Sequence, residues 1–239
     1  MKMNTEISVV ILCYKAENRV YDFAEKTIRL LESAGLSWEI ILVGNYLTGS
    51  DDKTPEIVKK IASKTKDVKA LALPKEGMMG WDARSGMNMA EGNFICLIDG
   101  DEQMPFQDII RVYEKIKSDS LDFVQTYRTV RHDGMIRKSI SSVYNLLFKF
   151  LFHGTTLNDI NSKPKIFTKE AYNKMRLTAD DWFIDAEMVI QSRRLKFKTG
   201  EIPTTFYKCG YRKSYVNFYA VFEFLKNLFV ARIRESFPK

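Results

Sequence analysis

Two carboxylates separated by one residue end an apolar run and offer the clearest chemistry in the sequence. Residues 94–98 have the length and branching of a buried strand, and Asp99 and Asp101 follow directly. Open α/β sheets bind ligands beyond the carboxyl ends of their strands, and Gly100 allows a sharp turn that aims both carboxylates at one point. Such a pair can hold a hard divalent cation, which can bind a diphosphate. An Asp-Gly turn between ordinary elements is the alternative.

The surrounding sequence predicts strands that alternate with helices. The expected strands are 7–13, 38–43, 68–73, 94–98 and 121–127. The expected helices are 17–33, 54–63, 105–117 and 188–195, with a short helix that ends near residue 92. This alternation favours an α/β fold with a mostly parallel, Rossmann-like sheet flanked by helices.

Several motifs in this order resemble the family-2 glycosyltransferases of the GT-A fold, especially the dolichol- and polyprenyl-phosphate sugar synthases. The resemblance covers about residues 6–205. It rests on Val9-Val10-Ile11-Leu12-Cys13-Tyr14, Thr54-Pro55-Glu56-Ile57-Val58, the spacing of Gly77, Gly80, Arg84, Gly86, Ala90 and Gly92, Asp99-Gly100-Asp101 with Gln103 and Pro105, and Gly200-Glu201-Ile202-Pro203. It implies a GT-A domain at 1–208, with a nucleotide-sugar half at 1–127, an acceptor half at 128–208, and a C-terminal amphipathic helical extension at 209–239.

The resemblance also implies a donor site in which Asp99 and Asp101 bind Mg²⁺ or Mn²⁺ and the diphosphate of a nucleotide sugar. The predicted donor-binding residues are Cys13, Tyr14, Glu17, Asn45, Gly77, Arg84, Asp99 and Asp101. The family usually has Tyr-Asn-Glu after the first strand, where this chain has Tyr14-Lys15-Ala16 with Glu17 one place later. It also usually has an Asp after the second strand, where this chain has Gly44-Asn45. The Asn45 amide can still bond a base edge, but these departures leave the base open and admit a weakened donor site.

Acidic residues before the predicted helix 188–195 are the candidates for acceptor chemistry. The predicted catalytic residues are Asp181, Asp185 and Glu187, and the resemblance implies that the last two lie near the acceptor. Helix capping is the alternative for Asp180 and Asp181. A hydroxyl acceptor needs a general base, which a carboxylate here can supply, whereas a phosphate acceptor is already an anion.

Positive charge is concentrated in the second half of the chain. Residues 1–120 hold 16 Lys and Arg against 19 Asp and Glu, whereas residues 121–239 hold 21 against 11. This asymmetry indicates an anionic partner, and a phosphorylated acceptor at an anionic membrane agrees with the resemblance. Nucleic acid is disfavoured because no helix-turn-helix, zinc spacing or stacking platform is visible. The predicted acceptor contacts are Gln103, Arg128, Arg131, Arg137, Asn161, Ser162 and Lys163, with Lys165 as a further cation.

Two aromatic-rich segments, 142–152 and 215–237, have basic flanks and the pattern of amphipathic helices. Such helices can lie in the interface of a bilayer, or they can pack on the sheet or on a second subunit. No secretory signal and no run of eighteen apolar residues is visible, so no transmembrane helix is expected. The three cysteines are interpreted as thiols in a reducing cytoplasm.

Together these features predict an inverting, metal-dependent glycosyltransferase that moves a sugar from a nucleotide diphosphate to a polyprenyl or dolichyl phosphate. We expect peripheral contact with the cytoplasmic face of the cell membrane, and a second copy or a membrane subunit as further partners. The alternatives are transfer to a sugar hydroxyl of a glycan and a non-catalytic nucleotide-sugar-binding or scaffold subunit. A sugar-nucleotide pyrophosphorylase is disfavoured because residues 12–19 contain no glycine for a phosphate loop.

Overall fold

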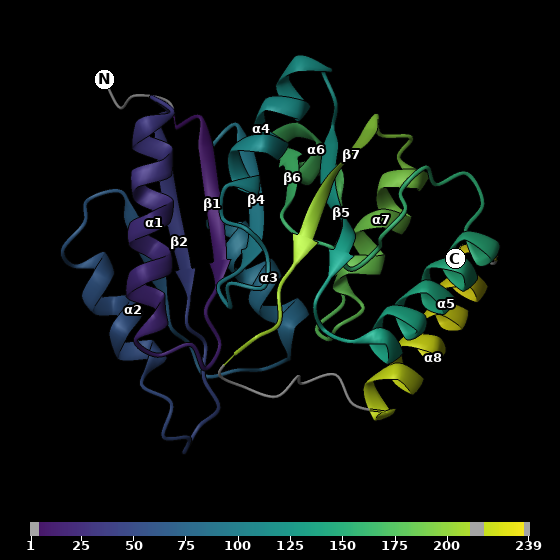
Figure 1. Ribbon diagram of the computed structural model, residues 1–239, viewed down its shortest axis with the longest axis horizontal. Helices are drawn as coiled ribbons and strands as arrows, with labels where there is room; N and C mark the ends of the chain where they lie inside the picture. The colour runs from purple at the N-terminus through teal and green to yellow at the C-terminus, as the bar shows by residue number, and fades with distance from the viewer. Residues whose placement is uncertain (1–4, 211–217, 237–239) are drawn as a thin grey trace.

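The computed structural model describes residues 5–210 and 218–236, and its strands form one mixed sheet (Figure 1). The strands are β1 (Ile7–Leu12), β2 (Trp38–Val43), β3 (Val68–Leu71), β4 (Phe94–Asp99), β5 (Phe123–Arg131), β6 (Lys165–Thr168) and β7 (Thr199–Phe206). Their spatial order is β3-β2-β1-β4-β6-β5-β7. Only β6 runs antiparallel to its neighbours, β4 and β5. The predicted mostly parallel sheet is therefore confirmed.

Helices cover both faces of this sheet (Figure 1). They are α1 (Arg19–Ser33), α2 (Thr54–Ala62), α3 (Met79–Asn88), α4 (Asp108–Ser118), α5 (Met135–Leu151), α6 (Lys169–Lys174), α7 (Ile184–Arg194) and α8 (Phe218–Ser236). Because strand side chains alternate between faces, β1 contributes Val9 and Ile11 to the core under α1, α2 and α4. Val10 and Leu12 point into the other core, beneath α3 and α7.

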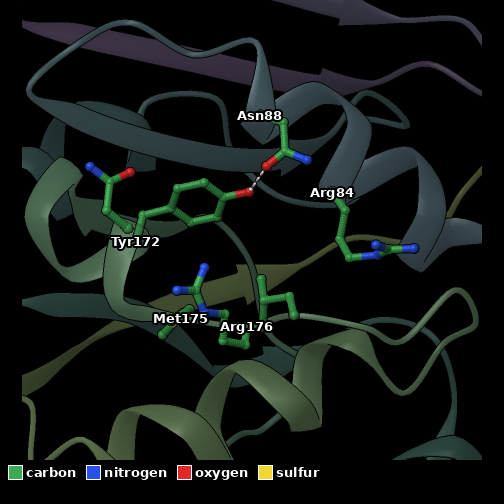
Figure 2. Close-up of a pocket in the computed structure, with 7 residues that line it drawn as sticks. Arg84, Asn88, Tyr172, Met175 and Arg176 are labelled. Atoms are coloured by element: carbon green, nitrogen blue, oxygen red, sulfur yellow. Dashed lines mark hydrogen bonds between the residues drawn. The ribbon is translucent and has the colours of Figure 1, made fainter.

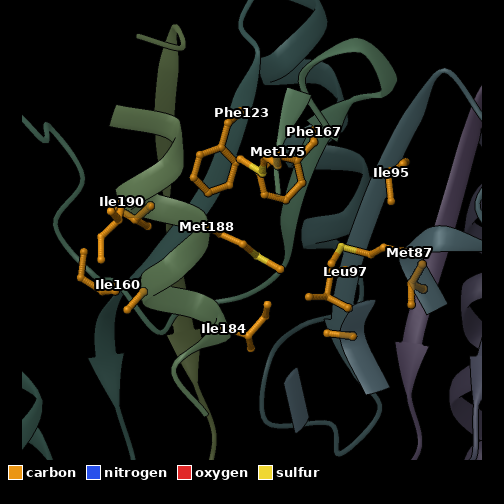
Figure 3. Packing of buried hydrophobic residues seen from close by; sticks show 14 of the residues in the cluster. Met87, Ile95, Leu97, Phe123, Ile160, Phe167, Met175, Ile184, Met188 and Ile190 are labelled. Carbon is orange, nitrogen blue, oxygen red and sulfur yellow. The ribbon is translucent and has the colours of Figure 1, made fainter. Parts of the chain in front are cut away.

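Aromatic and sulfur-containing side chains fill the second core where α7 crosses the sheet (Figure 3). The rings of Phe123 in β5 and Phe167 in β6 stack with centroids 4.4 Å apart, and Met188 of α7 lies close to them. Ile184, at the start of α7, is fully buried in the same cluster. This packing fixes the start of α7 relative to β4, β5 and β6, where the candidate site lies.

Several predicted boundaries shift by a few residues. The helix predicted from residue 105 begins at Asp108, because the three preceding residues form a turn in which the Asp108 N–H donates to Pro105 O. The strand predicted at 121–127 runs from Phe123 to Arg131, and the helix predicted from 188 begins at Ile184. The proposed boundary at 127/128 lies inside β5, so both predicted halves share one sheet.

The C-terminal helix α8 lies beside α5 (Figure 1) and packs on the domain through one side. Leu228 is fully buried in the core, and Glu235 forms an ion pair with Arg193 of α7. Part of the predicted helix 215–237 lies outside the described residues. Among the helices of the described segments, none has the length and apolar character needed to cross a membrane.

Candidate active site

The predicted metal pair lies at the carboxyl edge of the sheet, at the end of β4. Asp99 is in register with Leu12 of β1, and its side chain is 33% exposed. The Gly100 N–H donates to Leu12 O at 2.9 Å, and a Cβ on Gly100 would lie 3.0 Å from Ile11 Cγ2. Gly100 is therefore required for close approach to β1, and not for the positive φ that a sharp turn suggests. Asp101 follows at a partly exposed position.

A buried ammonium connects this edge to the start of α7. Lys163 Nζ lies 3.2 Å from Asp99 Oδ2 and 3.0 Å from Asp185 Oδ2, and its side chain is only 3% exposed. Burial alone would lower the pKa of Lys163, but Asp185 and Asp99 outweigh it and hold the pKa above its usual range. The predicted metal residue Asp99 and the predicted catalytic residue Asp185 thus share one cation.

A second buried lysine lies on the other side of Asp185. Lys165 Nζ donates to Gln125 Oε1 at 2.6 Å and to Ile160 O at 2.8 Å, and it lies 3.8 Å from Asp185 Oδ1. Burial lowers the pKa of Lys165 to about 8, and the nearby Lys163 charge acts in the same direction. Asp185 Oδ1 itself is buried and has no hydrogen-bond partner among the described residues.

Two of the predicted acceptor cations are already paired inside the protein. Arg128 forms a two-pronged pair with Asp159, with both N–O distances 2.6 Å, and the backbone N–H of Arg128 adds a third bond. Burial alone would raise the pKa of the Asp159 carboxyl, but the opposing effect of Arg128 is larger and holds this pKa below its usual range. Arg131 pairs in the same way with Asp133, and both guanidinium groups lie over the Phe206 ring.

The remaining acceptor candidates are placed differently. Arg137 lies in the first turn of α5, and its side chain forms no ion pair or hydrogen bond with the other described residues. Ser162 is fully buried, and its hydroxyl lies 2.6 Å from Thr126 Oγ1. Asn161 Oδ1 is buried without a partner among the described residues. The Gln103 side-chain amide donates to Tyr207 O at 3.0 Å, directly after β7. Of these side chains, Arg137 has donors left for an anionic ligand, whereas the orphan oxygen of Asn161 is an acceptor.

The other two predicted catalytic carboxylates hold loops in place. Glu187 accepts hydrogen bonds from the Thr178 N–H and hydroxyl and from the Ala179 N–H, at 2.8–3.0 Å. Asp181 Oδ2 accepts from Asn227 Nδ2 of α8 at 2.7 Å. These bonds brace the segment before α7, and a catalytic role for either residue stays a prediction.

On the donor side, Asn45 uses both ends of its amide within the protein. Its Nδ2 donates to Asp82 Oδ1, and its Oδ1 accepts from the Leu73 N–H, each at 2.9 Å. Asp82 also forms a buried ion pair with Lys75, whose ammonium lies 4.6 Å from the centre of the Tyr14 ring. Burial raises the pKa of Asp82, although Lys75 and Asn45 oppose it. The Asn45 amide is therefore not free to bond a base edge, and the half-buried Tyr14 ring lies beside this cluster.

Two further predicted donor residues, Cys13 and Glu17, lie directly after β1 and in the loop that follows it. Cys13 is 1% exposed, its thiol donates to Ile11 O, and burial raises its thiol pKa. The Glu17 N–H donates to the Thr54 hydroxyl at 3.0 Å, while the Glu17 side chain is exposed. The loop after β1 is thereby fixed to the start of α2.

The glycine-rich loop before α3 packs against the segment before α7. A Cβ on Gly77 would lie 2.9 Å from Asp180 Cβ, and one on Gly80 would lie 2.4 Å from Ala179 O. Arg84 forms an ion pair with Asp180. These glycines thus allow two loops to meet. Beside them, the Tyr172 hydroxyl donates to Asn88 in a shallow pocket (Figure 2) lined by Arg84, Asn88, Tyr172, Asn173, Met175, Arg176 and Leu177.

Residues 8–184 match the family model described as glycosyl transferase family 2. The chain belongs to glycosyltransferase family 2. The glycosyltransferase class predicted from the sequence is therefore confirmed. Among the curated relatives of this family-2 chain are undecaprenyl-phosphate 4-deoxy-4-formamido-L-arabinose transferases from Salmonella paratyphi B and Salmonella newport. Each is 32% identical over 146 residues, which is 60% of this chain and 43% of the relative. The chain thus matches less than half the length of these relatives.

Solved structures share the fold of this family-2 chain at low sequence identity. Glucosyl-3-phosphoglycerate synthase from Mycobacterium tuberculosis, in complex with Mn²⁺, UDP and phosphoglyceric acid, has a TM-score of 0.68 at 14% identity. That comparison covers 97% of this chain and 78% of the synthase. S. aureus TarS in complex with UDP-GlcNAc has a TM-score of 0.61 at 16% identity, covering 96% of this chain and 67% of TarS. The predicted GT-A fold is confirmed.

The carboxylates of Asp99 and Asp101 have the chemistry that suits a divalent cation bound together with phosphate. Within the described residues, no group of three or more His, Cys, Asp or Glu side chains could hold a metal by itself. Mg²⁺ is commonly bound by one or two carboxylates together with substrate phosphates, so Asp99 and Asp101 suit such a site. One oxygen of Asp99 already contacts Lys163.

Two buried ion pairs were not predicted from the sequence: Lys75–Asp82 and Arg128–Asp159. In contrast, the proximity of Lys163 and Lys165 could be predicted, because residues two apart in an extended segment share a face. The Lys75–Asp82 pair joins the loop after β3 to α3, and no regular spacing signals it. Arg128 and Asp159 are 31 residues apart in the sequence, and only the fold shows that Asp159 neutralises Arg128.

Proposed function

We propose that this glycosyltransferase moves a sugar from a nucleotide diphosphate to a polyprenyl phosphate, with inversion at the anomeric carbon. One observation carries the proposal. Asp99 from β4 and Asp185 from α7 meet at the Lys163 ammonium, so the predicted donor and acceptor sides share one point at the sheet edge. The names of the curated relatives support undecaprenyl phosphate or a similar lipid as the acceptor.

The reaction we propose is a single displacement. The acceptor oxygen attacks the anomeric carbon opposite the leaving group, its lone pair forms the new C–O bond, and the electrons of the broken C–O bond leave with the nucleoside diphosphate. Asp99 and Asp101 would hold Mg²⁺ or Mn²⁺, which when bound offsets negative charge on that diphosphate. The Mn²⁺ present in the structure of the synthase with the same fold supports this choice of metal.

A phosphate acceptor needs no general base, but it does need cations. Arg128 and Arg131 are neutralised within the protein, whereas Arg137 forms no ion pair with the other described residues. We therefore assign the acceptor phosphate to Arg137 at the start of α5. The orphan Oδ1 of Asn161 is an acceptor and does not donate to a phosphate, so Asn161 stays only a predicted contact.

The outer surfaces of α5 and α8 support contact with a membrane. Leu146 and Phe150 of α5 are 71% and 70% exposed, and Phe229 and Ile233 of α8 are 50% and 59% exposed. Exposed apolar groups on amphipathic helices with basic residues are typical of peripheral binding at a bilayer interface. We propose that this surface, α5 and α8 with these four residues, rests on the cytoplasmic face of the cell membrane. A second copy of the chain or a membrane subunit stays a prediction.

A hydroxyl acceptor is the second candidate, because Asp185 Oδ1 has no hydrogen-bond partner among the described residues and can take a proton. Asp185→Asn separates the two candidates. With a hydroxyl acceptor the rate should fall by about 10²–10⁴. With a phosphate acceptor the change acts through positioning, and Arg137→Met should instead raise the acceptor KM.

The direct test incubates purified protein with a panel of nucleotide sugars and undecaprenyl phosphate, with Asp101→Ala as the control. We expect a lipid-linked sugar phosphate from the unchanged protein and none from the variant. Transfer to glycan hydroxyls alone would favour the second candidate. Neither transfer nor donor hydrolysis with any nucleotide sugar would contradict an enzymatic role and favour a binding or scaffold subunit.

A further inference from the structure

The ammonium of Lys163 lies between carboxylates that come from distant parts of the chain. Asp99 is 64 residues away at the end of β4, and Asp185 is 22 residues away in the first turn of α7. Met79 Sδ of α3 lies 3.6 Å from the same nitrogen. Because the side chain is 3% exposed, these neighbours, and not water, surround the charge.

The backbone that carries Lys163 is fixed to the central sheet. The Thr126 hydroxyl of β5 donates to Lys163 O at 2.6 Å and lies 2.6 Å from the Ser162 hydroxyl. The Thr126 N–H donates to Pro164 O at 3.2 Å. These bonds hold the backbone on both sides of Lys163, so the turn into β6 cannot move away from Asp99 without breaking buried hydrogen bonds.

This placement changes what Asp99 can offer to a second cation. One of its oxygens, Oδ2, is bound to the ammonium, whose positive charge offsets the attraction of the Asp99 carboxylate for a divalent ion. This charge is poorly screened, because both Lys163 and Asp185 are buried. A diphosphate would add negative charge at this edge and so increase the attraction for the metal.

We propose that Lys163 is the resident counter-ion of Asp99, which prevents the site from binding a divalent cation alone and makes the metal enter together with the diphosphate. This inference rests on the proposed function, in which Asp99 and Asp101 hold the metal. Lys163 is then a positioning residue that acts through Asp99. Because Lys163 also contacts Asp185 directly, entry of the metal and diphosphate at Asp99 also affects the acceptor-side carboxylate.

The test measures Mn²⁺ affinity by electron paramagnetic resonance, without nucleotide. Lys163→Met alone would leave the buried Asp185 with only the more distant Lys165 ammonium, at 3.8 Å, so the main variant is the double Lys163→Met/Asp185→Asn. We expect the double variant to bind Mn²⁺ roughly tenfold or more tightly than the unchanged protein. An affinity equal to that of the unchanged protein, in a folded double variant, would overturn the inference.

Two single variants serve as controls. Asp185→Asn leaves Lys163 on Asp99, so its Mn²⁺ affinity should stay near that of the unchanged protein or fall below it. Lys26→Met removes a surface ammonium that pairs with Glu102, next to Asp101, and so tests charge without contact to a predicted ligand. It should change the affinity by less than about threefold, because exposed charges are screened. An effect as large as that of the double variant would refute a specific role for Lys163.

A second arm separates this inference from the proposed function. Mn²⁺ binding to the unchanged protein is measured with UDP, CDP, GDP and ADP in turn, and we expect at least one to tighten it. No Mn²⁺ binding with any of the four would contradict the metal-dependent function itself. Diphosphate-assisted binding in the unchanged protein, with no gain in the nucleotide-free double variant, would leave that function standing and reject the role of Lys163.

Discussion

Replacing Arg128 by Met tests how the acceptor half is built, because the sequence and the structure give this residue different roles. Its side chain is 8% exposed and forms two 2.6 Å bonds with Asp159, which is 9% exposed. Removal of one partner from a buried ion pair leaves the other charge unpaired and usually costs about 3–5 kcal/mol. We expect Arg128→Met to lower the free energy of unfolding by that amount.

Urea denaturation of four proteins provides the measurement: the unchanged chain, Arg128→Met, Asp159→Asn and the double variant. If the two side chains act as a pair, the double variant should lose less stability than the sum of the single variants, with a coupling of about 1–3 kcal/mol. Arg137→Met is the matched control, since Arg137 has no ion pair with the other described residues. Its free energy of unfolding should change by less than about 0.5 kcal/mol, while its acceptor KM should rise.

The opposite pattern would refute this reasoning. Arg128→Met would then unfold at the same urea concentration as the unchanged protein and raise the acceptor KM, while Arg137→Met would leave the KM unchanged. That result would make Arg128 an acceptor contact and the pair with Asp159 energetically unimportant.

Three further predictions concern the metal, the buried lysine and the membrane. Asp101→Ala should abolish transfer with little change in the urea midpoint, because it removes a ligand from a partly exposed loop; activity that survives both this change and EDTA would exclude a metal-dependent reaction. Burial lowers the pKa of Lys165 to about 8, so between pH 8 and its ordinary value of 10.5 the unfolded chain binds more protons. The free energy of unfolding should therefore rise with pH across this window, by about 3 kcal/mol because of Lys165. Urea titrations should show a steeper rise with pH for the unchanged protein than for Lys165→Met. Equal slopes of stability against pH would contradict the lowered pKa of Lys165. Leu146→Ser/Phe150→Ser should weaken flotation with anionic vesicles at low salt without changing stability, whereas Leu47→Ser, at an exposed site after β2, should have no effect. Unaltered flotation of the double variant would move the membrane contact elsewhere.

Most of the sheet could be predicted because its buried strands have recognisable apolar sequences. Residues 94–98 are a continuous apolar run, and residues 38–43 are interrupted only by Glu39, which suits strands covered by helices on both faces; the structure has them as β2 and β4. The antiparallel placement of β6 could not be predicted from its four residues, because they have no distinctive pattern and are inserted between β4 and β5 by long-range pairing. Yet this insertion brings Lys163 beneath Asp99.

Site residues were predictable by type and only partly by role. A carboxylate pair after a strand is placed by the strand itself, so Asp99 and Asp101 lie where the pattern indicates. Whether a cation is available to a ligand depends on its partner, and the partner of Arg128 is 31 residues away in sequence. The Asn45 amide nitrogen is likewise occupied by a hydrogen bond to Asp82, 37 residues away. Such pairs are set by the fold and have no local signal.

The same pairing shows where the positive surplus of the second half resides. Arg128, Arg131, Lys163 and Lys165 all face carboxylates, so they add little to the outer field. Exposed cations of α5 and α8 without an ion pair to the other described residues include Lys138, Lys226 and Arg234. These are the helices that expose Leu146, Phe150, Phe229 and Ile233. Exposed positive charge and exposed apolar groups on the same helices together favour an anionic bilayer. The surplus of Lys and Arg in the second half therefore supports the proposed membrane surface more strongly than it supports a cationic acceptor cavity.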